Sequence, residues 1–213
     1  MKEEWSDKED VAKNRKHFLD GLNIDPKTVV MPEIVHGAKI LAAGKSDWGK
    51  TLKGADGLVT TLEGVFLMVT VADCFPIFIY DPVTQAVALA HAGWRGIIDK
   101  ISLKLIEKLQ GLGSDPNNLI LGLGPGICQK HFVVKKDVLT LFQEEYPQAV
   151  LIRNHDGYID LRKAMTRDFQ KLGVSHHNIE VSNNCPLCHN GIYGSFRKEG
   201  VHAPASAAVI GMR

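Results

Sequence analysis

The chain has 213 residues, of which 45% are apolar and 23% are charged, and its formal net charge is +1. A chain of this size can bury a sizeable core without disulfides, and its near-neutral charge gives no electrostatic reason to expect a nucleic-acid or membrane partner. Its apolar runs are all shorter than the roughly 20 residues that cross a bilayer, and the highly charged first ten residues do not resemble a signal peptide, so we expect a cytoplasmic protein.

The apolar patterning predicts helices and strands in mixed order. In chain order the sequence predicts a helix over 11–22, β-type chain over 29–42, a polar loop over 44–54, strands over 57–60, 65–71, 76–80 and 86–92, a helix over 97–109, a strand over 119–123, a helix over 137–146, a strand over 150–153, a helix over 161–172, and strands over 179–182 and 206–210. Because some strands follow one another directly and others are separated by helices, the pattern favours an α+β fold with mixed β-sheets over a doubly wound parallel sheet. We expect one domain over residues 1–213.

A hairpin is predicted where Asp81-Pro82 separates two short apolar runs. Cys74 precedes the first strand of this hairpin and His91 lies near the end of the second. In a tight register the two side chains would lie close together. A thiolate and an imidazole in that position suit either a metal site or a Cys/His catalytic pair.

A third candidate ligand is His36, which stands beside Gly37 in β-type chain. Three protein ligands with an open position are typical of a catalytic zinc site. From spacing alone, however, a buried cysteine and two ordinary histidines are the simpler interpretation. In the alternative catalytic hypothesis, Cys74 is a nucleophile whose pKa is lowered by His91, and Asp73 or another polar group orients the imidazole.

Residues 93–96 read Gly-Trp-Arg-Gly and precede a predicted helix. Backbone N–H groups at a helix start, with the guanidinium of Arg95 beside them, would form an anion site suited to phosphate. The alternative is a strand-to-helix turn in which the glycines only permit tight geometry and Arg95 lies on the surface.

The four cysteines, Cys74, Cys128, Cys185 and Cys188, are expected to be thiols or metal ligands in a cytoplasmic chain. The Cys185-Pro-Leu-Cys188 motif resembles half a zinc knuckle, but no second Cys-x-x-Cys follows or precedes it, so a Cys₄ site is not available. Its position near the C-terminus argues against a thioredoxin-like redox motif. We therefore interpret this motif as two thiols in a tight turn.

Several blocks occur in an order that resembles one family. They are Val35-His36-Gly37, Ala55-Asp56-Gly57-Leu58-Val59-Thr60, Ala72-Asp73-Cys74-Phe75-Pro76 and His91-Ala92-Gly93-Trp94-Arg95-Gly96. Together they are similar to the laccase-domain family, the YfiH-like proteins also called multicopper polyphenol oxidoreductases. The resemblance runs from about Glu9 to the end of the chain. It departs from the family pattern at Ile34, where glutamine is usual, and at His202-Ala203-Pro204, where Thr-Gly-Arg is usual.

The resemblance implies a zinc site made of His36, Cys74 and His91. Beside Cys74 and His91, the further catalytic candidates are Asp73, from its proximity to the motif, and Arg95, from the anion site at residues 93–96. It implies a single α/β/β/α domain, with mixed sheets layered between helices, like YfiH and the cytotoxic necrotizing factor class of cysteine hydrolases. It also implies that adenosine, inosine, guanosine and methylthioadenosine are cleaved with phosphate, and that adenosine is deaminated. Zinc at such a site lowers the pKa of a water toward about 7, which suits attack at C6 of adenine.

Three other functions stay open at this stage. Copper-dependent polyphenol oxidation would need further histidine-rich copper sites, and the nine histidines include no His-x-His pair. An amide hydrolase would use Cys74 and His91 without metal. A non-enzymatic metal-binding protein would need no substrate contacts. The sequence does not specify the preferred nucleoside or the oligomeric state.

Overall fold

A computed structural model describes residues 8–213 of the chain, which form an α+β domain with three β-sheets. The central sheet has six strands in the order β12-β8-β6-β7-β4-β2. These strands are β12 (Ile179–Val181), β8 (Ile120–Leu123), β6 (Phe75–Asp81), β7 (Ala86–Ala92), β4 (Gly57–Thr60) and β2 (Ile40–Ala42). The two outer pairs are parallel and the inner pairs are antiparallel, so the sheet is mixed, as the sequence predicts.

A second mixed sheet has four strands in the order β13-β5-β1-β3. They are β13 (Ser206–Gly211), β5 (Phe66–Val71), β1 (Val29–Pro32) and β3 (Thr51–Leu52). Its inner face packs on the central sheet, where Leu67 and Val69 meet Leu58 and Leu89 in one buried cluster. Side chains alternate across each strand, so the opposite faces of both sheets are left for helices to cover.

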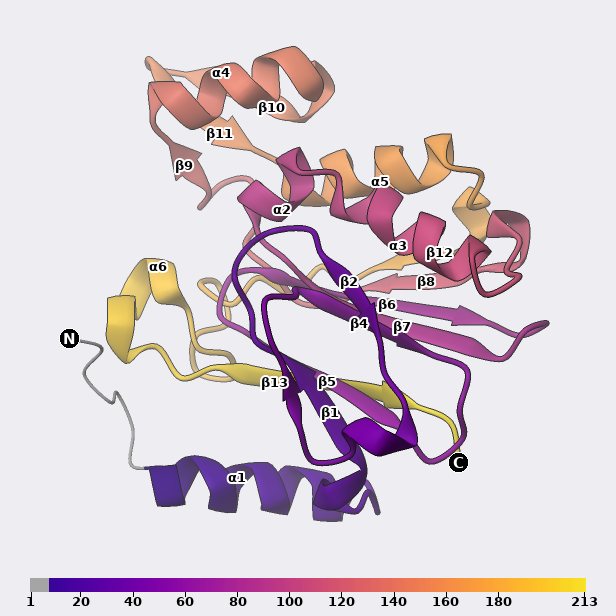
Figure 1. The fold of residues 1–213 in the computed structure, drawn as a ribbon. Coiled ribbons are helices and arrows are strands. Elements are labelled where there is room, and N and C mark those ends of the chain that lie inside the picture. The colour runs from indigo at the N-terminus through magenta and orange to yellow at the C-terminus, as the bar shows by residue number, and fades with distance from the viewer. Residues whose placement is uncertain (1–7) are drawn as a thin grey trace.

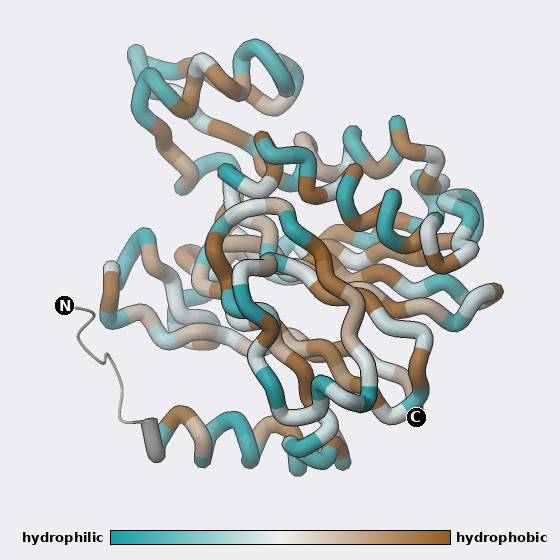
Figure 2. Tube along the Cα trace, viewed as in Figure 1, coloured by the Kyte–Doolittle hydropathy of each residue, from teal (hydrophilic) through white to brown (hydrophobic). Residues whose placement is uncertain are grey.

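Helices cover these two outer faces (Figure 1). The helices α2 (Trp94–Ile98), α3 (Ile101–Gln110) and α5 (Leu161–Lys171) pack on the central sheet in the largest apolar cluster. On the other side, α1 (Lys8–Gly21) packs Leu19 against Phe66 and Met68 of β5. Figure 2 shows apolar segments concentrated along the strands.

The third sheet is a small antiparallel one that packs with a helix. It contains β10 (Val150–Arg153), β11 (Asp156–Ile159) and β9 (Val133–Val134), in that order, and α4 (Lys136–Glu145) lies against it. The remaining helix, α6 (Phe196–Glu199), belongs to the mostly irregular stretch before β13. Short 3₁₀ helices occupy Pro26–Thr28, Lys45–Asp47, Pro116–Asn118, Pro147–Ala149, His176–Asn178 and Gly200–His202.

Three of the predicted elements are wrong in detail. The β-type chain predicted over 29–42 is two strands, β1 and β2, separated by a loop that includes His36. The single helix predicted over 97–109 is two helices, because Lys100 has φ +64° between α2 and α3. The Tyr146 hydroxyl donates a hydrogen bond to the Ile97 carbonyl at this break, and Lys100 Nζ lies 3.3 Å from the same hydroxyl. The polar loop predicted over 44–54 contains β3, whose two residues pair with β1 through the backbone.

The helix prediction over 161–172 is confirmed as α5, and the structure shows that the Asp160 carboxylate caps its start by accepting a hydrogen bond from the backbone N–H of Lys163. No helix among the described residues is long and apolar enough to span a membrane. The prediction about a signal peptide concerns residues that lie mainly outside the described part of the chain.

Candidate metal centre

The three predicted ligands come together at one end of the central sheet. His36 lies in the loop between β1 and β2, Cys74 lies in the turn between β5 and β6, and His91 lies on β7. Their ligand atoms are all within 4.8 Å of one another. The two imidazole rings meet edge to face, with 4.9 Å between their centroids. We call these three residues the first cluster.

The hairpin register explains how Cys74 and His91 meet. In β6 and β7, Pro76 pairs with His91 and Phe75 pairs with Ala92. Extending that register by one pair places Gly93 opposite Cys74, so Cys74 and His91 are diagonal neighbours on the same face of the hairpin. A Cβ added at Gly93 would stand only 3.0 Å from Cys74 Sγ, so glycine leaves room around the sulfur.

Asp56 organises the loop that carries His36. Its carboxylate is fully buried and accepts hydrogen bonds from the backbone N–H groups of Val35 at 3.2 Å, His36 at 2.7 Å and Gly37 at 2.7 Å. His36 has φ +61°, a conformation that is uncommon for a residue with a side chain. The three bonds to one carboxylate hold the backbone in that conformation.

The same carboxylate faces His91. The Nδ1 atom of His91 is buried, has no hydrogen bond, and lies 3.6 Å from Asp56 Oδ1. A carboxylate behind one imidazole nitrogen fixes the ring so that the other nitrogen can bind a metal. Asp56 is the main residue that the sequence analysis missed as a site residue. The sequence feature that could have identified Asp56 is the position of an acidic residue between Ala55 and strand β4, whose residues are all buried.

The electrostatics of the first cluster favour a thiolate beside a protonated imidazole. Burial raises the pKa of the Cys74 thiol, but hydrogen bonds with His36 and His91 lower it to about 7. Burial lowers the pKa of His91, but the Asp56 carboxylate and Cys74 raise it to about 9. Burial raises the pKa of Asp56, but the nearby His91 imidazole and the hydrogen bonds from the backbone N–H groups of Gly37 and His36 lower it below its usual value.

These residues fit a zinc ion. One thiolate and two imidazoles form a ligand set that zinc prefers, and the unbonded Nδ1 of His91 has its carboxylate partner in place. His36 is exposed whereas His91 is buried, so the cluster opens to solvent on the His36 side. Three ligands and an open side are the arrangement of a catalytic rather than a structural zinc site.

Asp73, a predicted catalytic residue, faces away from the imidazole. Its buried carboxylate accepts hydrogen bonds from the Ser195 hydroxyl at 2.8 Å and from the Arg197 backbone N–H at 2.6 Å. Asp73 also has φ +79°. The carboxylate that faces His91 is therefore Asp56, and Asp73 joins the turn before Cys74 to a segment more than 120 residues later.

Arg95, the predicted phosphate ligand, is exposed in the first turn of α2. Its guanidinium carbon lies 4.4 Å from the ring centroid of Trp94, a cation–π distance. Gly96 next to it packs closely on the backbone, since a Cβ there would come within 2.6 Å of the Gly37 carbonyl oxygen. The structure thus places residues 93–96 against the loop that carries His36.

A second cluster corrects the interpretation of the Cys185-x-x-Cys188 motif. Cys128 and His131 lie beside Cys185 and Cys188, and the four ligand atoms are within 4.8 Å of one another. The motif is therefore part of a Cys₃His group and not merely two thiols in a turn. The other half of the group is Cys128-x-x-His131. It has the same spacing as Cys185-x-x-Cys188 but was not predicted as its partner, because its second ligand is a histidine.

The second cluster also perturbs its own thiols. Burial raises the pKa of Cys185, but hydrogen bonds from His131 and from the backbone N–H groups of Cys128 and Cys188 lower it to about 6. Burial and the neighbouring Cys185 sulfur raise the pKa of Cys128 to about 11. Without a cation, the cluster thus favours a Cys185 thiolate next to a Cys128 thiol that keeps its proton.

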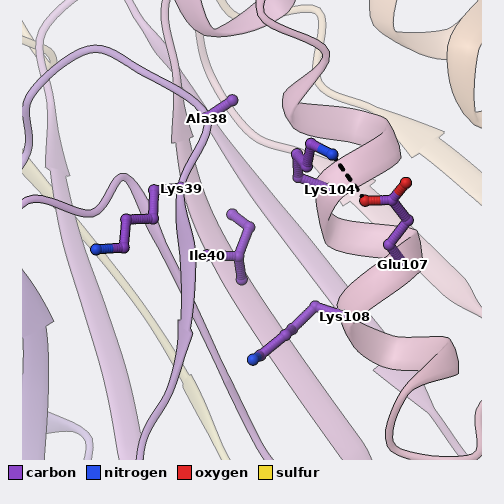
Figure 3. Close-up of a pocket in the computed structure, with 6 residues that line it drawn as sticks. All are labelled: Ala38, Lys39, Ile40, Lys104, Glu107 and Lys108. Atoms are coloured by element: carbon purple, nitrogen blue, oxygen red, sulfur yellow. Dashed lines mark hydrogen bonds and ion pairs between the residues drawn. The ribbon is translucent and has the colours of Figure 1, made fainter.

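A surface groove of about 480 Å³ lies between α3 and the chain leading into β2 (Figure 3). It is lined by Ala38, Lys39, Ile40, Lys104, Glu107 and Lys108. Lys104 and Glu107 form an ion pair at 2.9 Å across one turn of α3. None of the lining residues belongs to either cluster, so the groove is not the site of the metal chemistry.

Comparison with known proteins agrees with this architecture. A family model described as multi-copper polyphenol oxidoreductase laccase matches residues 3–213. The chain is 30% identical over 194 residues to adenosine deaminase RL5 of an unknown prokaryotic organism, covering 85% of this chain and 74% of that protein. It is 29% identical over 216 residues to purine nucleoside phosphorylase YlmD of Bacillus subtilis, covering 96% and 78% of the two chains. The crystal structure of YlmD from Geobacillus stearothermophilus matches with a TM-score of 0.93 at 30% identity, covering 97% of this chain and 82% of that one.

Proposed function

The chain belongs to the multi-copper polyphenol oxidoreductase laccase family, and from that premise we propose that it is a zinc-dependent purine nucleoside phosphorylase that also deaminates adenosine. The observation that carries the proposal is the first cluster, in which His36, Cys74 and His91 converge with an open side. Relatives named as a purine nucleoside phosphorylase and an adenosine deaminase support the substrate class. The proposed substrates are adenosine, inosine, guanosine and methylthioadenosine.

In phosphorolysis, a phosphate oxygen attacks C1′ of the ribose and the glycosidic bond breaks. The base leaves with a proton, and the products are ribose 1-phosphate and the free base. His36, Cys74 and His91 would hold the zinc ion, which would supply an electrophilic centre for this reaction. Arg95, exposed in the turn between Gly93 and Gly96, binds and orients the phosphate dianion through its guanidinium.

In deamination, water adds at C6 of adenine and ammonia leaves, which gives inosine. Asp56 holds His91 in one orientation and keeps the His36 loop in place, so the ligands do not have to reorganise during the reaction. Asp73 acts as a positioning residue, because its carboxylate anchors the turn that precedes Cys74 to residues 195–197. We also propose that the layered α/β/β/α fold of this chain is shared with a class of cysteine hydrolases.

An assay on zinc-loaded protein tests the proposal. Adenosine with phosphate should give adenine and ribose 1-phosphate, whereas adenosine without phosphate should give only inosine. A Cys74→Ser variant should lose both activities, and Asp81→Asn, a buried aspartate on the far end of β6, should keep them. If neither adenine, ribose 1-phosphate nor inosine forms, the proposal is wrong.

One observation favours a second candidate, a cysteine hydrolase. The lowered pKa of Cys74, about 7, and the raised pKa of His91, about 9, describe the thiolate–imidazolium pair that a nucleophilic cysteine needs. This candidate predicts amide hydrolysis by metal-free protein and its loss on alkylation of Cys74. The zinc proposal predicts the opposite, namely that metal-free protein is inactive before any alkylation.

For copper-dependent polyphenol oxidation no comparable support is found. Multicopper chemistry needs several histidine-rich copper sites, and over residues 8–213 the grouped histidine, cysteine and acidic ligands form only the two clusters described.

The four cysteines form no disulfide in that part of the chain, which suits the reducing cytoplasm that we propose as the location.

A further inference from the structure

The four side chains of the second cluster are spaced like the corners of a metal-binding tetrahedron. Nδ1 of His131 lies 3.5 Å from Cys128 Sγ, 3.7 Å from Cys185 Sγ and 3.5 Å from Cys188 Sγ. Tetrahedral zinc with Zn–S bonds of about 2.3 Å and Zn–N bonds of about 2.0–2.1 Å requires N···S separations of about 3.6 Å. The observed distances agree with that requirement.

The chemistry of the second cluster also differs from that of the first. Three sulfurs and one imidazole complete a four-ligand shell, which leaves no position for a substrate and is typical of structural zinc. Each half of the cluster comes from a two-residue spacing, Cys128-x-x-His131 and Cys185-x-x-Cys188. The backbone N–H of Cys128 donates to Cys185 Sγ at 3.4 Å, so the segment that carries Cys128 already hydrogen-bonds to a sulfur of the other segment.

We propose that Cys128, His131, Cys185 and Cys188 bind a second, structural zinc ion. Binding releases the protons of the ligating thiols to solvent and involves no change of oxidation state. The ion would join two segments 57 residues apart in sequence, one between β8 and β9 and one between β12 and α6. The second of these begins an irregular stretch, residues 183–205, that contains only α6 and one 3₁₀ helix. We call residues 183–205 the C-terminal arm.

Both joined segments contact Asp73, the residue before Cys74 of the first cluster. The backbone N–H of Ile127, next to Cys128, donates to the Asp73 carbonyl at 2.8 Å. From the C-terminal arm, Ser195 and Arg197 donate to the Asp73 carboxylate. The second zinc would therefore fix the two supports that hold Asp73 at its positive φ angle. Its role is to hold the turn of the first cluster rather than to touch a substrate.

Metal analysis of the full-length protein, purified without chelator, tests this proposal. The wild-type protein should carry two zinc ions per chain, and Cys188→Ser should carry one fewer. Cys188 is exposed, so this substitution leaves the apolar core intact. The matched control is His189→Ala, which changes the next residue but removes no member of the cluster, and this variant should keep both ions.

A second measurement identifies the ligands without relying on the cysteine variant. In His36→Ala, the first cluster loses a ligand, so the zinc that stays bound should be that of the second cluster. X-ray absorption at the zinc edge should then show three sulfur ligands and one nitrogen ligand. Amide hydrogen exchange reports the anchoring role: the Arg197 amide should exchange faster in Cys188→Ser than in the wild type or in His189→Ala.

Three outcomes would overturn the proposal. The first is equal zinc content in the wild type and Cys188→Ser. The second is a sulfur-poor ligand shell in His36→Ala. The third is a disulfide between cysteines of the second cluster, found by mass spectrometry of protein prepared under reducing conditions. Each result can be read whether or not the protein cleaves nucleosides, because none of these measurements depends on activity.

Discussion

Asp56 supports both histidines of the first cluster, because one buried carboxylate lies 3.6 Å from Nδ1 of His91 and binds the backbone N–H of His36 at 2.7 Å. Removing its charge should weaken zinc binding without removing a ligand. We expect Asp56→Asn to bind zinc about 10–100-fold more weakly at the first cluster, measured by competition with a chelator of known affinity. Asp81→Asn is the control, since Asp81 is an equally buried aspartate on the same sheet. Equal affinities in the two variants would contradict the prediction.

The protonation state of Cys74 can be measured in metal-free protein. Its pKa of about 7 lies below the ordinary value of 9 because hydrogen bonds with the two histidines outweigh burial. Above pH 7 the sulfur is therefore mainly a thiolate, and below pH 7 it is mainly a thiol. The rate of iodoacetamide labelling, followed for the Cys74 peptide by mass spectrometry, should rise with pH with its midpoint near 7. A midpoint near 9 would show that the histidines do not act on the sulfur.

Gly93 keeps the space around Cys74 open. An added Cβ would lie 3.0 Å from Cys74 Sγ, 3.7 Å from a His36 ring carbon and 3.9 Å from a His91 ring carbon. We expect Gly93→Ala to fold, because its φ of −91° suits alanine, but to displace the ligands and reduce kcat by about 10–100-fold. Gly44→Ala is the control, since its added Cβ has no neighbour closer than 3.8 Å. Unchanged turnover in both variants would contradict the role assigned to this glycine.

The hydrogen bonds between Asp73 and the C-terminal arm should contribute measurably to stability. Asp73→Asn weakens two charge-assisted bonds, and we expect it to lower the free energy of unfolding by about 1–3 kcal/mol. Ser195→Ala removes one of the same bonds at a cost of about 1 kcal/mol. Urea denaturation of both variants and of the double variant forms a cycle. The double variant should lose less than the sum of the single losses, and strict additivity would show that the two side chains do not interact.

Several parts of the fold could be predicted because their signals are local. The hairpin of β6 and β7 follows from two apolar runs around Asp81-Pro82, and α5 follows from the apolar pattern over 161–172. The strands β3, β9 and β11 were missed. β3 and β9 have only two residues each and form through backbone pairing with a distant partner, and β11 begins with the polar Asp156 and with Gly157. The break between α2 and α3 was also missed, because the apolar spacing of the segment continues across Lys100.

The same distinction holds for the sites. Cys74 and His91 could be paired from the sequence because one hairpin joins them. His36 was a third candidate from its place beside Gly37, and the family resemblance implied the same three residues. Asp56 could not be identified from spacing, because its role depends on a loop folded over it from another strand. The second cluster was hidden for a related reason: Cys128 and Cys185 are 57 residues apart, and only the parallel pairing of β8 with β12 brings their loops together.

The chain order of the Asp73 contacts has a consequence for synthesis on the ribosome. All three ligands of the first cluster have been translated by residue 91, but Ser195 and Arg197 emerge more than 100 residues later. The strand β13, which pairs with β5 along its whole length, emerges last of all. A nascent chain therefore holds the ligands before it holds the contacts that position them. A chain that stops before residue 206 lacks β13 and would leave one edge of β5 unpaired and open to association with other chains.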